Sequence, residues 1–447
     1  MKDSQLQLKL PGVPLAKQGR EVPVQWDWTE ASVWTSRMLA TLERGIKGGK
    51  WYSLMDKVWN QSNLQSALEQ VCHNKGSAGV DGQSTDALRR KSEAILPRIQ
   101  EQLRNGQYEP KPVKRQWIDK LGSKEKRPLG IPTVQDRVVQ TAARNVIEPI
   151  FEHGFAEHSY GFRPGRGAKD ALRRVDQLLK SGQTWIVDAD LKGYFDSIPQ
   201  DQLMEALSTK ISDGGLLDLI QRFLKQGVME SAKEWKPTKN GTPQGAVISP
   251  LLANIYLDPL DHLMAGNGRN MVRYADDFVV LCASVEEAEG ALQQIQQWVK
   301  SAGLVLHPTK TRIVDASQKG GFDFLGYHFE RGMRWPRQKS LEKLKETIRQ
   351  KTRRTNGKSM KQIICEVNLT LRGWYGYFRH SQKSAFGDLD SWVRGRLRAI
   401  LRKRHRLKGW VRMRDSKLWP NAYFVEHGLF CMTMARAKAS QSQWRNR

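Results

Sequence analysis

Met271-Val-Arg-Tyr-Ala-Asp-Asp-Phe-Val-Val-Leu-Cys282 is the stretch of sequence that decides the fold. Apolar residues, including the strand-favouring run Val279 to Leu281, stand on both sides of two neighbouring acids, Asp276 and Asp277. The pattern predicts a strand, a tight turn and a second strand, with the acids at the turn. Like charges side by side repel unless a cation offsets them. The stretch therefore allows two interpretations, a solvated hairpin tip or a divalent-metal site for phosphoryl chemistry.

A second apolar run also leads directly into acids, in Thr184-Trp-Ile-Val-Asp-Ala-Asp-Leu-Lys-Gly-Tyr-Phe-Asp-Ser-Ile198. Because side chains alternate along a strand, Asp188 and Asp190 share one face. Acids at the end of a core strand destabilise it unless they are coordinated or hydrogen-bonded. One of these two acids could join Asp276 and Asp277 at a metal site, and the spacing alone does not say which. With this second stretch, the functional interpretation is favoured over the solvated tip.

The charge balance of the chain points to a polyanionic partner. Lys and Arg number 73 and Asp and Glu number 46, which gives a net charge of +27 and favours nucleic acid. No stretch reaches ~18 uninterrupted apolar residues, so we expect no membrane partner. The first residues lack the apolar core of a secretory signal. No two of the four cysteines have metal-clip spacing, which predicts reduced thiols in a cytosolic protein: Cys72, Cys282, Cys365 and Cys431.

Helical periodicity surrounds the two acidic stretches. Apolar positions predict helices over 133–151, 168–179 and 286–302. After about residue 335 the strand pattern stops, and a helix around 389–401 carries arginines with few acids to balance them. A solvated face is the usual explanation of a charge run, but charges of one sign favour a nucleic-acid face.

Glycine-rich and basic segments stand between these elements. The loop 74–82 has three glycines beside a lysine, a composition that suits phosphate contact. Residues 108–132 read as a basic hairpin that could cover a triphosphate. The loop 159–167 combines aromatics, arginines and glycines, which suits the binding of nucleic acid. Each segment, taken alone, also fits a solvated surface loop.

The order of these segments resembles a group II intron reverse transcriptase over about residues 52–330. One motif alone would be weak evidence, but seven in order are specific: the basic hairpin, the loop 159–167, Asp190-Leu-Lys-Gly-Tyr-Phe-Asp196, Gly241-Thr-Pro-Gln-Gly245, Tyr274-Ala-Asp-Asp277, Lys310-Thr311 and Phe324-Leu-Gly326. Asn368-Leu-Thr-Leu-Arg-Gly-Trp-Tyr-Gly-Tyr-Phe378 and the arginine-bearing helix resemble the maturase, or X, domain of that family. The His/Asn nuclease domain with paired cysteines that many relatives carry is not recognised. The chain therefore resembles the bacterial, endonuclease-lacking type, and we expect no cleavage of DNA strands.

The resemblance implies an α+β fold of the right-hand polymerase type, with fingers, an antiparallel palm sheet and an all-α thumb or X domain. It also suggests four segments. These are an N-terminal extension, partly disordered, at 1–50; the fingers and palm at 51–330; the thumb or maturase domain at 331–405; and a basic segment, a candidate for DNA binding, at 406–447.

The resemblance further implies the roles of individual residues. Asp190, and not Asp188, matches the third catalytic acid beside Asp276 and Asp277. Two Mg²⁺ ions, with Mn²⁺ as a substitute, would be held by these three acids and Leu191. The nucleotide-binding residues would be Lys120, Arg127, Phe195, Gln244 and Lys310, with Phe195 excluding a ribose 2′-OH. The expected nucleic-acid contacts are Lys75, Arg163, Arg166, Arg394, Arg398, Arg402 and Arg404.

These features predict an RNA-directed DNA polymerase, a nucleotidyltransferase, that also binds group II intron RNA and promotes its splicing and mobility. Its partners would be intron RNA, an RNA template with a DNA primer, target DNA and dNTP, in the bacterial cytoplasm or at the nucleoid. Two alternatives remain, a domesticated reverse transcriptase in repair or phage defence and an RNA-binding splicing factor without polymerase activity. The three acids and Gln244 are all present, which argues against an inactive polymerase.

Overall fold

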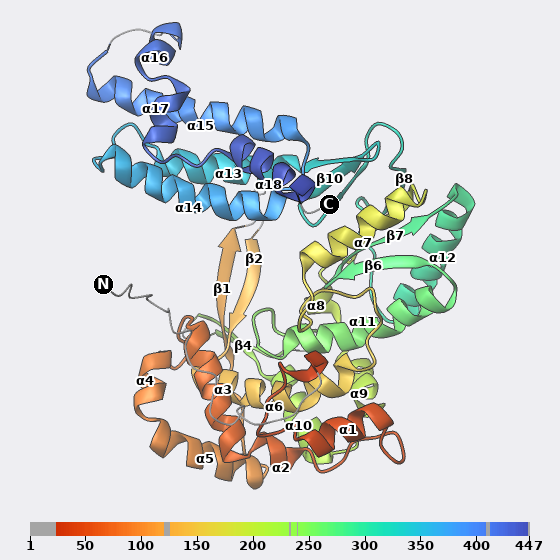
Figure 1. The fold of residues 1–447 in the computed structure, drawn as a ribbon. Helices are drawn as coiled ribbons and strands as arrows, with labels where there is room; N and C mark the ends of the chain where they lie inside the picture. The colour runs from red at the N-terminus through yellow and green to blue at the C-terminus, as the bar shows by residue number, and fades with distance from the viewer. Residues whose placement is uncertain (1–23, 120–125, 232–233, 239, 408–411, 446–447) are drawn as a thin grey trace.

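A four-stranded antiparallel sheet carries the two acidic stretches (Figure 1). The computed structural model describes residues 24–119, 126–231, 234–238, 240–407 and 412–445. The strand order is β6 (Asn270–Tyr274), β7 (Asp277–Cys282), β3 (Trp185–Asp190) and β8 (Arg312–Asp315). The hairpin predicted over 271–282 is therefore β6 and β7, joined by a two-residue turn. We call this sheet, with the helices packed on it, the palm.

Alternation along the palm strands gives the sheet two different faces. Val187, Ala189 and Val280 point into the larger of the hydrophobic cores. Ile186 and Val279 point to the opposite face, into a smaller core. Successive side chains point to opposite sides of a strand. Asp190 at the end of β3 and Asp277 at the start of β7 therefore lie on the same face as Ile186 and Val279.

Helices cover both faces of the palm. The palm helices are α7 (Ala168–Lys180), α8 (Tyr194–Ser197), α9 (Gln200–Ser208), α10 (Gly214–Lys225), α11 (Ser249–Gly266) and α12 (Val285–Ser301). Apolar residues of α11 and α12 belong to the larger core, and those of α7 belong to the smaller one. The smaller core also contains residues of a three-stranded sheet, β9 (Phe322–Phe324), β10 (Tyr327–Glu330) and β11 (Met333–Pro336).

The fingers combine helices with a second four-stranded sheet. Their helices are the 3-10 helix Val24–Trp26, α1 (Ser36–Arg44), α2 (Met55–Val58), α3 (Gln61–Asn74), α4 (Thr85–Arg90), α5 (Ser92–Arg104) and α6 (Val134–Glu152). Their strands are β1 (Val113–Asp119), β2 (Lys126–Ile131), β4 (Val228–Ser231) and β5 (Glu234–Lys236). The hairpin of β1 and β2 rises from the fingers toward the helices at the top of Figure 1.

The described part of the thumb, residues 338–407 and 412–445, has helices as its regular elements. These are α13 (Gln338–Lys351), α14 (Met360–Phe378), α15 (Lys383–Arg404), α16 (Arg412–Leu418), α17 (Asn421–Glu426) and α18 (Met432–Arg445). They have their own hydrophobic core, which includes Leu371, Phe386 and Leu397. The α+β fold with an antiparallel palm sheet and a helical C-terminal region is therefore confirmed.

Several long helices begin at a side chain that caps the first free backbone amides. Thr133, Asp213, Ser284 and Ser359 accept hydrogen bonds from amides in the first turns of α6, α10, α12 and α14. Such a cap typically stabilises a helix by ~1 kcal/mol. The starts of these helices are therefore fixed by local sequence.

The limits of the four predicted segments stay predictions, and described residues of the two terminal segments pack into the neighbouring regions. Trp34, from the predicted extension 1–50, is fully buried and donates its indole N–H to the carbonyl of Asn145 at 2.9 Å. Phe424 and Met432, from the predicted segment 406–447, are fully buried in the thumb core. Part of the N-terminal segment thus packs against the fingers, and part of the C-terminal segment belongs to the thumb core.

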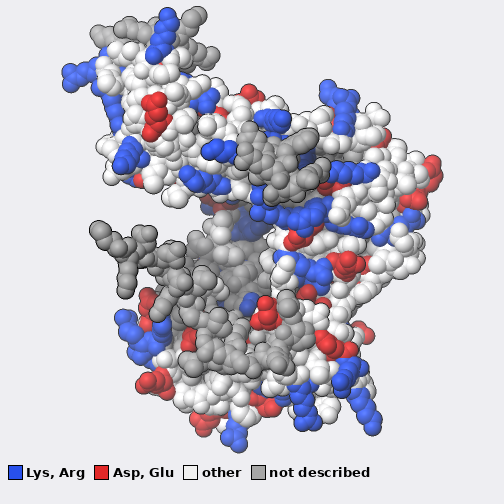
Figure 2. Space-filling view, in the orientation of Figure 1, with Lys and Arg blue, Asp and Glu red and all other residues white. Residues whose placement is uncertain are grey.

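The surface is hollowed between the fingers and the thumb (Figure 2). Lys and Arg side chains gather along the thumb and the palm beside this hollow in the view of Figure 2. Among the described helices, none combines the length and the apolar character that crossing a bilayer requires. The distribution of charge on this face agrees with a polyanionic partner.

Glu148 of α6 is a buried acid whose ionisation opposes folding. Burial raises the pKa of Glu148 to about 7, Arg144 at 3.5 Å lowers it, and Glu152 raises it. The folded state therefore holds a proton that the unfolded chain has lost. Stability should then fall as the pH rises from the ordinary value of 4.5 to about 7.

Glu148→Gln should therefore stabilise the protein by roughly 2 kcal/mol at pH 8 and change its stability little at pH 5. Chemical unfolding of both proteins at the two pH values measures the difference. An equal effect at pH 5 and pH 8 would contradict this explanation.

Candidate active site

Strand register brings two of the three predicted catalytic acids together. In the pairing of β3 with β7, Asp190 stands opposite Asp277. Asp276 lies in the turn immediately before β7. Ala275, the residue before it, has a φ of 60°, in the left-handed region that non-glycine residues rarely adopt. Acids from two distant stretches are thus carried by neighbouring strands and a tight, strained turn.

Asp188 differs from Asp190 in its partner. It stands opposite Arg312 of β8, whose Nε lies 3.4 Å from its carboxylate. Burial raises the pKa of Asp188, and Arg312 lowers it. The register thus places Asp190, and not Asp188, directly across from Asp277.

Burial and mutual repulsion raise the pKa values of these acids. For Asp276, burial is the largest cause of the raised pKa, and Asp190 adds to it. For Asp277, burial together with the charges of Asp188, Asp276 and Asp190 raises the pKa to about 7. Carboxylates that oppose one another's ionisation form a site that a cation would stabilise.

Two basic side chains from other parts of the chain act on the same acids. Lys310 forms an ion pair with Asp190. Lys310 and Arg127 both lower the pKa of Asp276. Arg127 belongs to β2, so the fingers and the palm contribute to one site. Lys120, which the sequence pairs with Arg127 as a triphosphate clamp, lies outside the described residues.

The donor set fits a divalent metal, although the side chains are not gathered around one. Within the described residues, no group of three or more His, Cys, Asp and Glu side chains is arranged to hold a metal ion. Instead, the Lys310 ammonium pairs with the Asp190 carboxylate. Carboxylate oxygens are the hard ligands that Mg²⁺ and Mn²⁺ prefer. A divalent ion would offset the repulsion among Asp190, Asp276 and Asp277 more fully than one ammonium does.

A segment after α12 runs beside the end of β3 and positions Lys310. The amide of His307 donates to the carbonyl of Asp190 at 2.7 Å, and Leu191 forms an antiparallel bridge with Leu306. Leu191 has a buried, apolar side chain, so the group it can offer a metal is its backbone carbonyl. These contacts fix the chain that leads to Lys310 against the strand that carries Asp190.

The glycine-rich loop before α11 brings Phe195 and Gln244 into one site. The amide of Thr242 donates to the carbonyl of Phe195 at 2.7 Å. The amide side chain of Gln244 donates to Asp196 Oδ2 at 2.8 Å. The carbonyl of Gln244 accepts from the amide of Gly130 in β2 at 2.6 Å. The loop therefore links the two predicted nucleotide-binding residues to the fingers.

Arg163, a predicted nucleic-acid contact, is bound inside the protein. Its guanidinium makes two hydrogen bonds of 2.9 and 3.0 Å from Nε to Glu152, and Nη1 donates to the carbonyls of Ala156 and Ser159. Its side chain is 2% exposed. Composition alone suggested a nucleic-acid contact, but Arg163 is better described as the residue that holds the loop 159–167 to α6.

The other predicted contacts in the loops are more accessible. Arg166 is half-buried, donates to the carbonyl of Glu157 and lies over the ring of Tyr160. Lys75 is exposed at the end of α3 and has a φ of 57°. The loop that follows packs on the fingers through Ser77, whose carbonyl accepts from Arg137. Both basic residues stay candidates for contact with nucleic acid.

Three of the four predicted arginines of α15 are partly engaged within the thumb. Arg398 donates to the carbonyl of Trp419 at 2.9 Å, and Arg402 pairs with Asp415 at 2.6 Å. Arg404 donates to backbone carbonyls that precede α14. These bonds order the arginines and use part of their hydrogen-bonding capacity.

A basic groove of about 810 Å³ lies along α15. Its charged residues are mostly cations: Arg354, Arg396, Arg398, Arg402 and Lys403 against Asp388 and Asp415. Arg394 is half-buried on the same helix, and its Nε has no hydrogen-bond partner. The excess of cations in the groove suits contact with a phosphate backbone.

Sequence reasoning missed three arginines that act on the site. Arg115 lowers the pKa of Asp196, and Arg337 lowers the pKa of Asp277. Arg273, in β6 and three residues before Asp276, is fully buried. The first two come from β1 and from the residue before α13, so no spacing connects them to the motifs. For Arg273 the sequence does carry a signal, because a charged residue inside an otherwise apolar strand needs a buried partner.

Comparison with known families identifies two domains in the chain. Residues 113–329 match the reverse transcriptase (RNA-dependent DNA polymerase) domain. Residues 341–419 match the maturase-specific domain of group II introns. The first match contains all three acids, and the second contains α14 and α15. A reverse transcriptase domain implies a polymerase that depends on a divalent metal ion.

Curated relatives extend this comparison. The group II intron-encoded protein LtrA of Lactococcus lactis subsp. cremoris is 42% identical over 195 residues, which cover 44% of this chain and 32% of LtrA. Protein YkfC of Escherichia coli (strain K12) is 32% identical over 309 residues, which cover 60% of this chain and 80% of YkfC. The aligned part is thus about a third of LtrA and most of YkfC. From its two matched domains and these relatives, the chain belongs to the group II intron-encoded reverse transcriptases and maturases.

Proposed function

We propose that this protein is an RNA-directed DNA polymerase that also binds group II intron RNA and promotes its splicing and mobility. The observation that carries the proposal is the register of the palm sheet, in which Asp190 stands opposite Asp277 beside the turn residue Asp276. Three carboxylates at one end of a sheet, with basic residues from the fingers nearby, suit the transfer of a nucleotidyl group.

Asp190, Asp276 and Asp277, with the backbone carbonyl of Leu191, are the groups that would hold two Mg²⁺ ions, for which Mn²⁺ could substitute. When bound, these ions would lower the pKa of the primer 3′-OH and offset the charge that develops on the transferring phosphoryl group. The raised pKa values of Asp276 and Asp277 support this assignment, because a cation bound by both carboxylates would offset the repulsion between them.

The basic residues around the acids would bind the triphosphate of an incoming dNTP. Lys310 now pairs with Asp190, and a bound metal would free its ammonium to donate to phosphate oxygens. Arg127, on the hairpin of the fingers, would bind the same phosphates, and its effect on the pKa of Asp276 supports this role. We propose that Lys120 assists them.

Phe195 and Gln244 would orient the sugar and base of that nucleotide. The ring of Phe195 is half-buried, and its backbone is held by Thr242. We therefore propose that the ring leaves no room for a ribose 2′-OH. Gln244 is fixed by Asp196 and by its own backbone bond to Gly130, which keeps it next to that space.

The thumb would bind the RNA. The groove along α15, with Arg394, Arg398, Arg402 and Arg404 on that helix, would contact the phosphate backbone of structured intron RNA. Lys75 and Arg166 would contact the template and primer. In splicing, the protein would stabilise RNA structure, and the reaction itself would belong to the RNA. Target DNA would be the site into which the intron inserts, at the nucleoid.

Primer extension on an RNA template with Mg²⁺ tests the proposed activity. The purified protein should extend a DNA primer with dNTPs, and chelation of the metal should stop extension. High-salt purification followed by sequencing of the bound RNA tests the second role, because phosphate contacts alone weaken steeply with salt. We expect one dominant, structured RNA; a smear of cellular RNAs would overturn the maturase assignment and leave the polymerase.

A further inference from the structure

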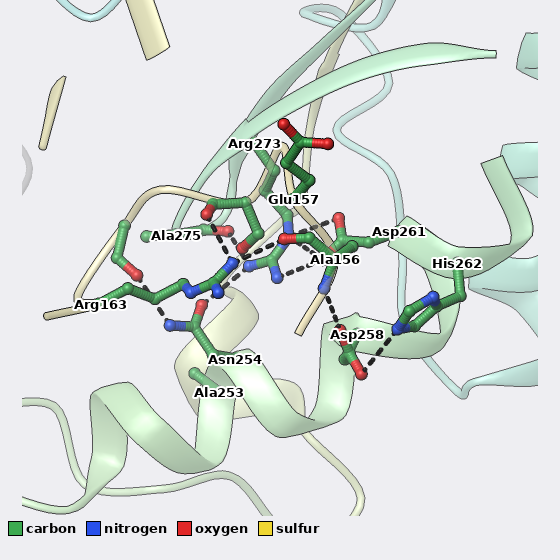
Figure 3. A network of polar contacts seen from close by, with 12 residues as sticks. Ala156, Glu157, Arg163, Ala253, Asn254, Asp258, Asp261, His262, Arg273 and Ala275 are labelled. Atoms are coloured by element: carbon green, nitrogen blue, oxygen red, sulfur yellow. Dashed lines mark hydrogen bonds and ion pairs between the residues drawn. The ribbon is translucent and has the colours of Figure 1, made fainter. Parts of the chain in front are cut away.

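Arg273 lies in β6, two residues before the strained turn residue Ala275, and is completely buried (Figure 3). Its Nε donates to both carboxylate oxygens of Asp261 at 2.8 and 2.9 Å. Its Nη1 donates to Asn254 Oδ1 and to the carbonyl of Ala275, each at 2.9 Å. One guanidinium therefore joins the turn before the catalytic acids to two side chains of α11.

The two α11 residues are suited to hold this guanidinium. Asn254 and Asp261 are seven positions apart, about two helical turns, so they lie on one face of the helix. Burial lowers the pKa of Arg273, but Asp261 outweighs this effect and raises it. Arg273 therefore keeps its charge although it is buried. A buried pair of this kind is a poor way to gain stability compared with apolar packing, which suggests that its value lies in position.

Backbone of the loop 159–167 also packs against the turn. Asn254 Nδ2 donates to the carbonyl of Gly161 at 2.7 Å. A Cβ on Gly161 would lie 2.2 Å from the amide nitrogen of Ala275, so this backbone packs directly against the turn. The amide of Tyr160 donates to the carbonyl of Arg273 at 2.9 Å. Strained backbone conformations persist only where their surroundings fix them. The conformation of Ala275 is fixed by Arg273 and by the loop 159–167.

We propose that Arg273, fixed by Asp261 and Asn254, is a positioning residue for the catalytic turn. It holds the carbonyl of Ala275 so that the next residue, Asp276, stays beside Asp190 and Asp277. The guanidinium is fully buried and donates to protein groups, so its effect on the acids passes through the backbone of the turn. The inference rests on the proposed polymerase function, because it assigns those three acids to the reaction.

Two buried asparagines provide a matched test. Asn254 and Asn63 are 1% and 0% exposed, and each accepts one side-chain hydrogen bond; Asn254 donates to one backbone carbonyl and Asn63 to two. Asn63 lies in α3 of the fingers, where it accepts from Asn145, far along the chain from the turn. Asn254→Ala and Asn63→Ala should therefore lower the melting temperature by similar amounts. Only the first should disturb the turn.

Primer extension by the full chain should separate the two variants. Asn254→Ala should reduce kcat about tenfold with KM for dNTP changed less than about twofold, because a small displacement of a catalytic group costs rate rather than binding. Asn63→Ala should keep kcat within about twofold of wild type. Arg273→Lys retains the charge but cannot bond Asp261, Asn254 and Ala275 together, and should lose about 100-fold in kcat.

Hydrogen exchange of the metal-free protein gives a readout apart from activity. The peptide 271–282 should exchange faster in Asn254→Ala than in wild type, and at the wild-type rate in Asn63→Ala. Equal kcat and equal exchange in both variants would overturn the positioning role and leave a structural one. A wild-type protein that extends no primer would instead overturn the proposed function, while the exchange data would still show whether Arg273 and Asn254 hold the turn.

Discussion

Asp276→Ala is expected to reduce DNA synthesis at least about 1,000-fold while RNA affinity changes less than about threefold. Asp276 lies in the turn beside the opposed pair Asp190 and Asp277, so its loss removes one of the three carboxylates proposed to hold the metal. The basic groove of the thumb is formed by other residues and should bind RNA as before. Primer extension and filter binding on the same preparation measure the two effects.

Asp188→Ala is the matched control for this substitution. Asp188 lies on the same strand and face as Asp190 but pairs with Arg312. We expect synthesis to fall less than about tenfold in this variant, because an ion pair whose arginine is largely exposed contributes little. Asp276→Ala should also be at least as stable as wild type, since burial and repulsion raise the pKa of the acid it removes. Loss of RNA binding in a folded Asp276→Ala protein would show that the two roles are not separate.

Phe195→Val is expected to increase ribonucleotide incorporation relative to deoxynucleotides by about 10- to 100-fold. The Phe195 ring packs against Tyr194, with 5.7 Å between ring centroids, and its carbonyl accepts from the amide of Thr242, so we expect the ring to stay in place against a 2′-OH. A smaller side chain opens that space without changing the acids. The ratio of kcat/KM for each dNTP and the matching ribonucleotide measures the change.

Phe195→Tyr keeps the bulk of the ring and serves as the control. It should discriminate against ribonucleotides within about threefold of wild type. If Phe195→Val discriminates as well as the wild type does, the ring is not the group that excludes the 2′-OH. If the Tyr variant loses discrimination as the Val variant does, chemical identity rather than volume decides it.

Local elements follow from the sequence because their causes are local. Strand-favouring apolar residues on both sides of Asp276 and Asp277 predicted the hairpin, and the structure has β6 and β7 there. Helical spacing predicted a helix over 133–151, and α6 runs from Val134 to Glu152 after the cap at Thr133. These features depend on side-chain periodicity and on hydrogen bonds between near neighbours.

The directions of charged side chains did not follow from the sequence. The loop 159–167 has the composition of a nucleic-acid contact, but the buried guanidinium of Arg163 donates its hydrogen bonds to Glu152 and to two backbone carbonyls. Arg398 and Arg402, predicted to face RNA, give part of their hydrogen bonds to Trp419 and Asp415. Composition reports which charges a segment carries, and packing decides which of them face the solvent.

By itself, the sequence determined that acids end one strand and occupy a turn, that a helical region follows the strands, and that the chain suits a polyanion. Only the tertiary structure decided that Asp190 rather than Asp188 stands opposite Asp277, that Arg127 and Lys310 lower the pKa of Asp276, and that Arg273 donates to the carbonyl of Ala275 in the turn. The physical reason is that strand register and side-chain partners join residues far apart in the chain. A shift of one residue in the register would turn these acids to the other face of the sheet, so the whole packed fold is needed to fix them.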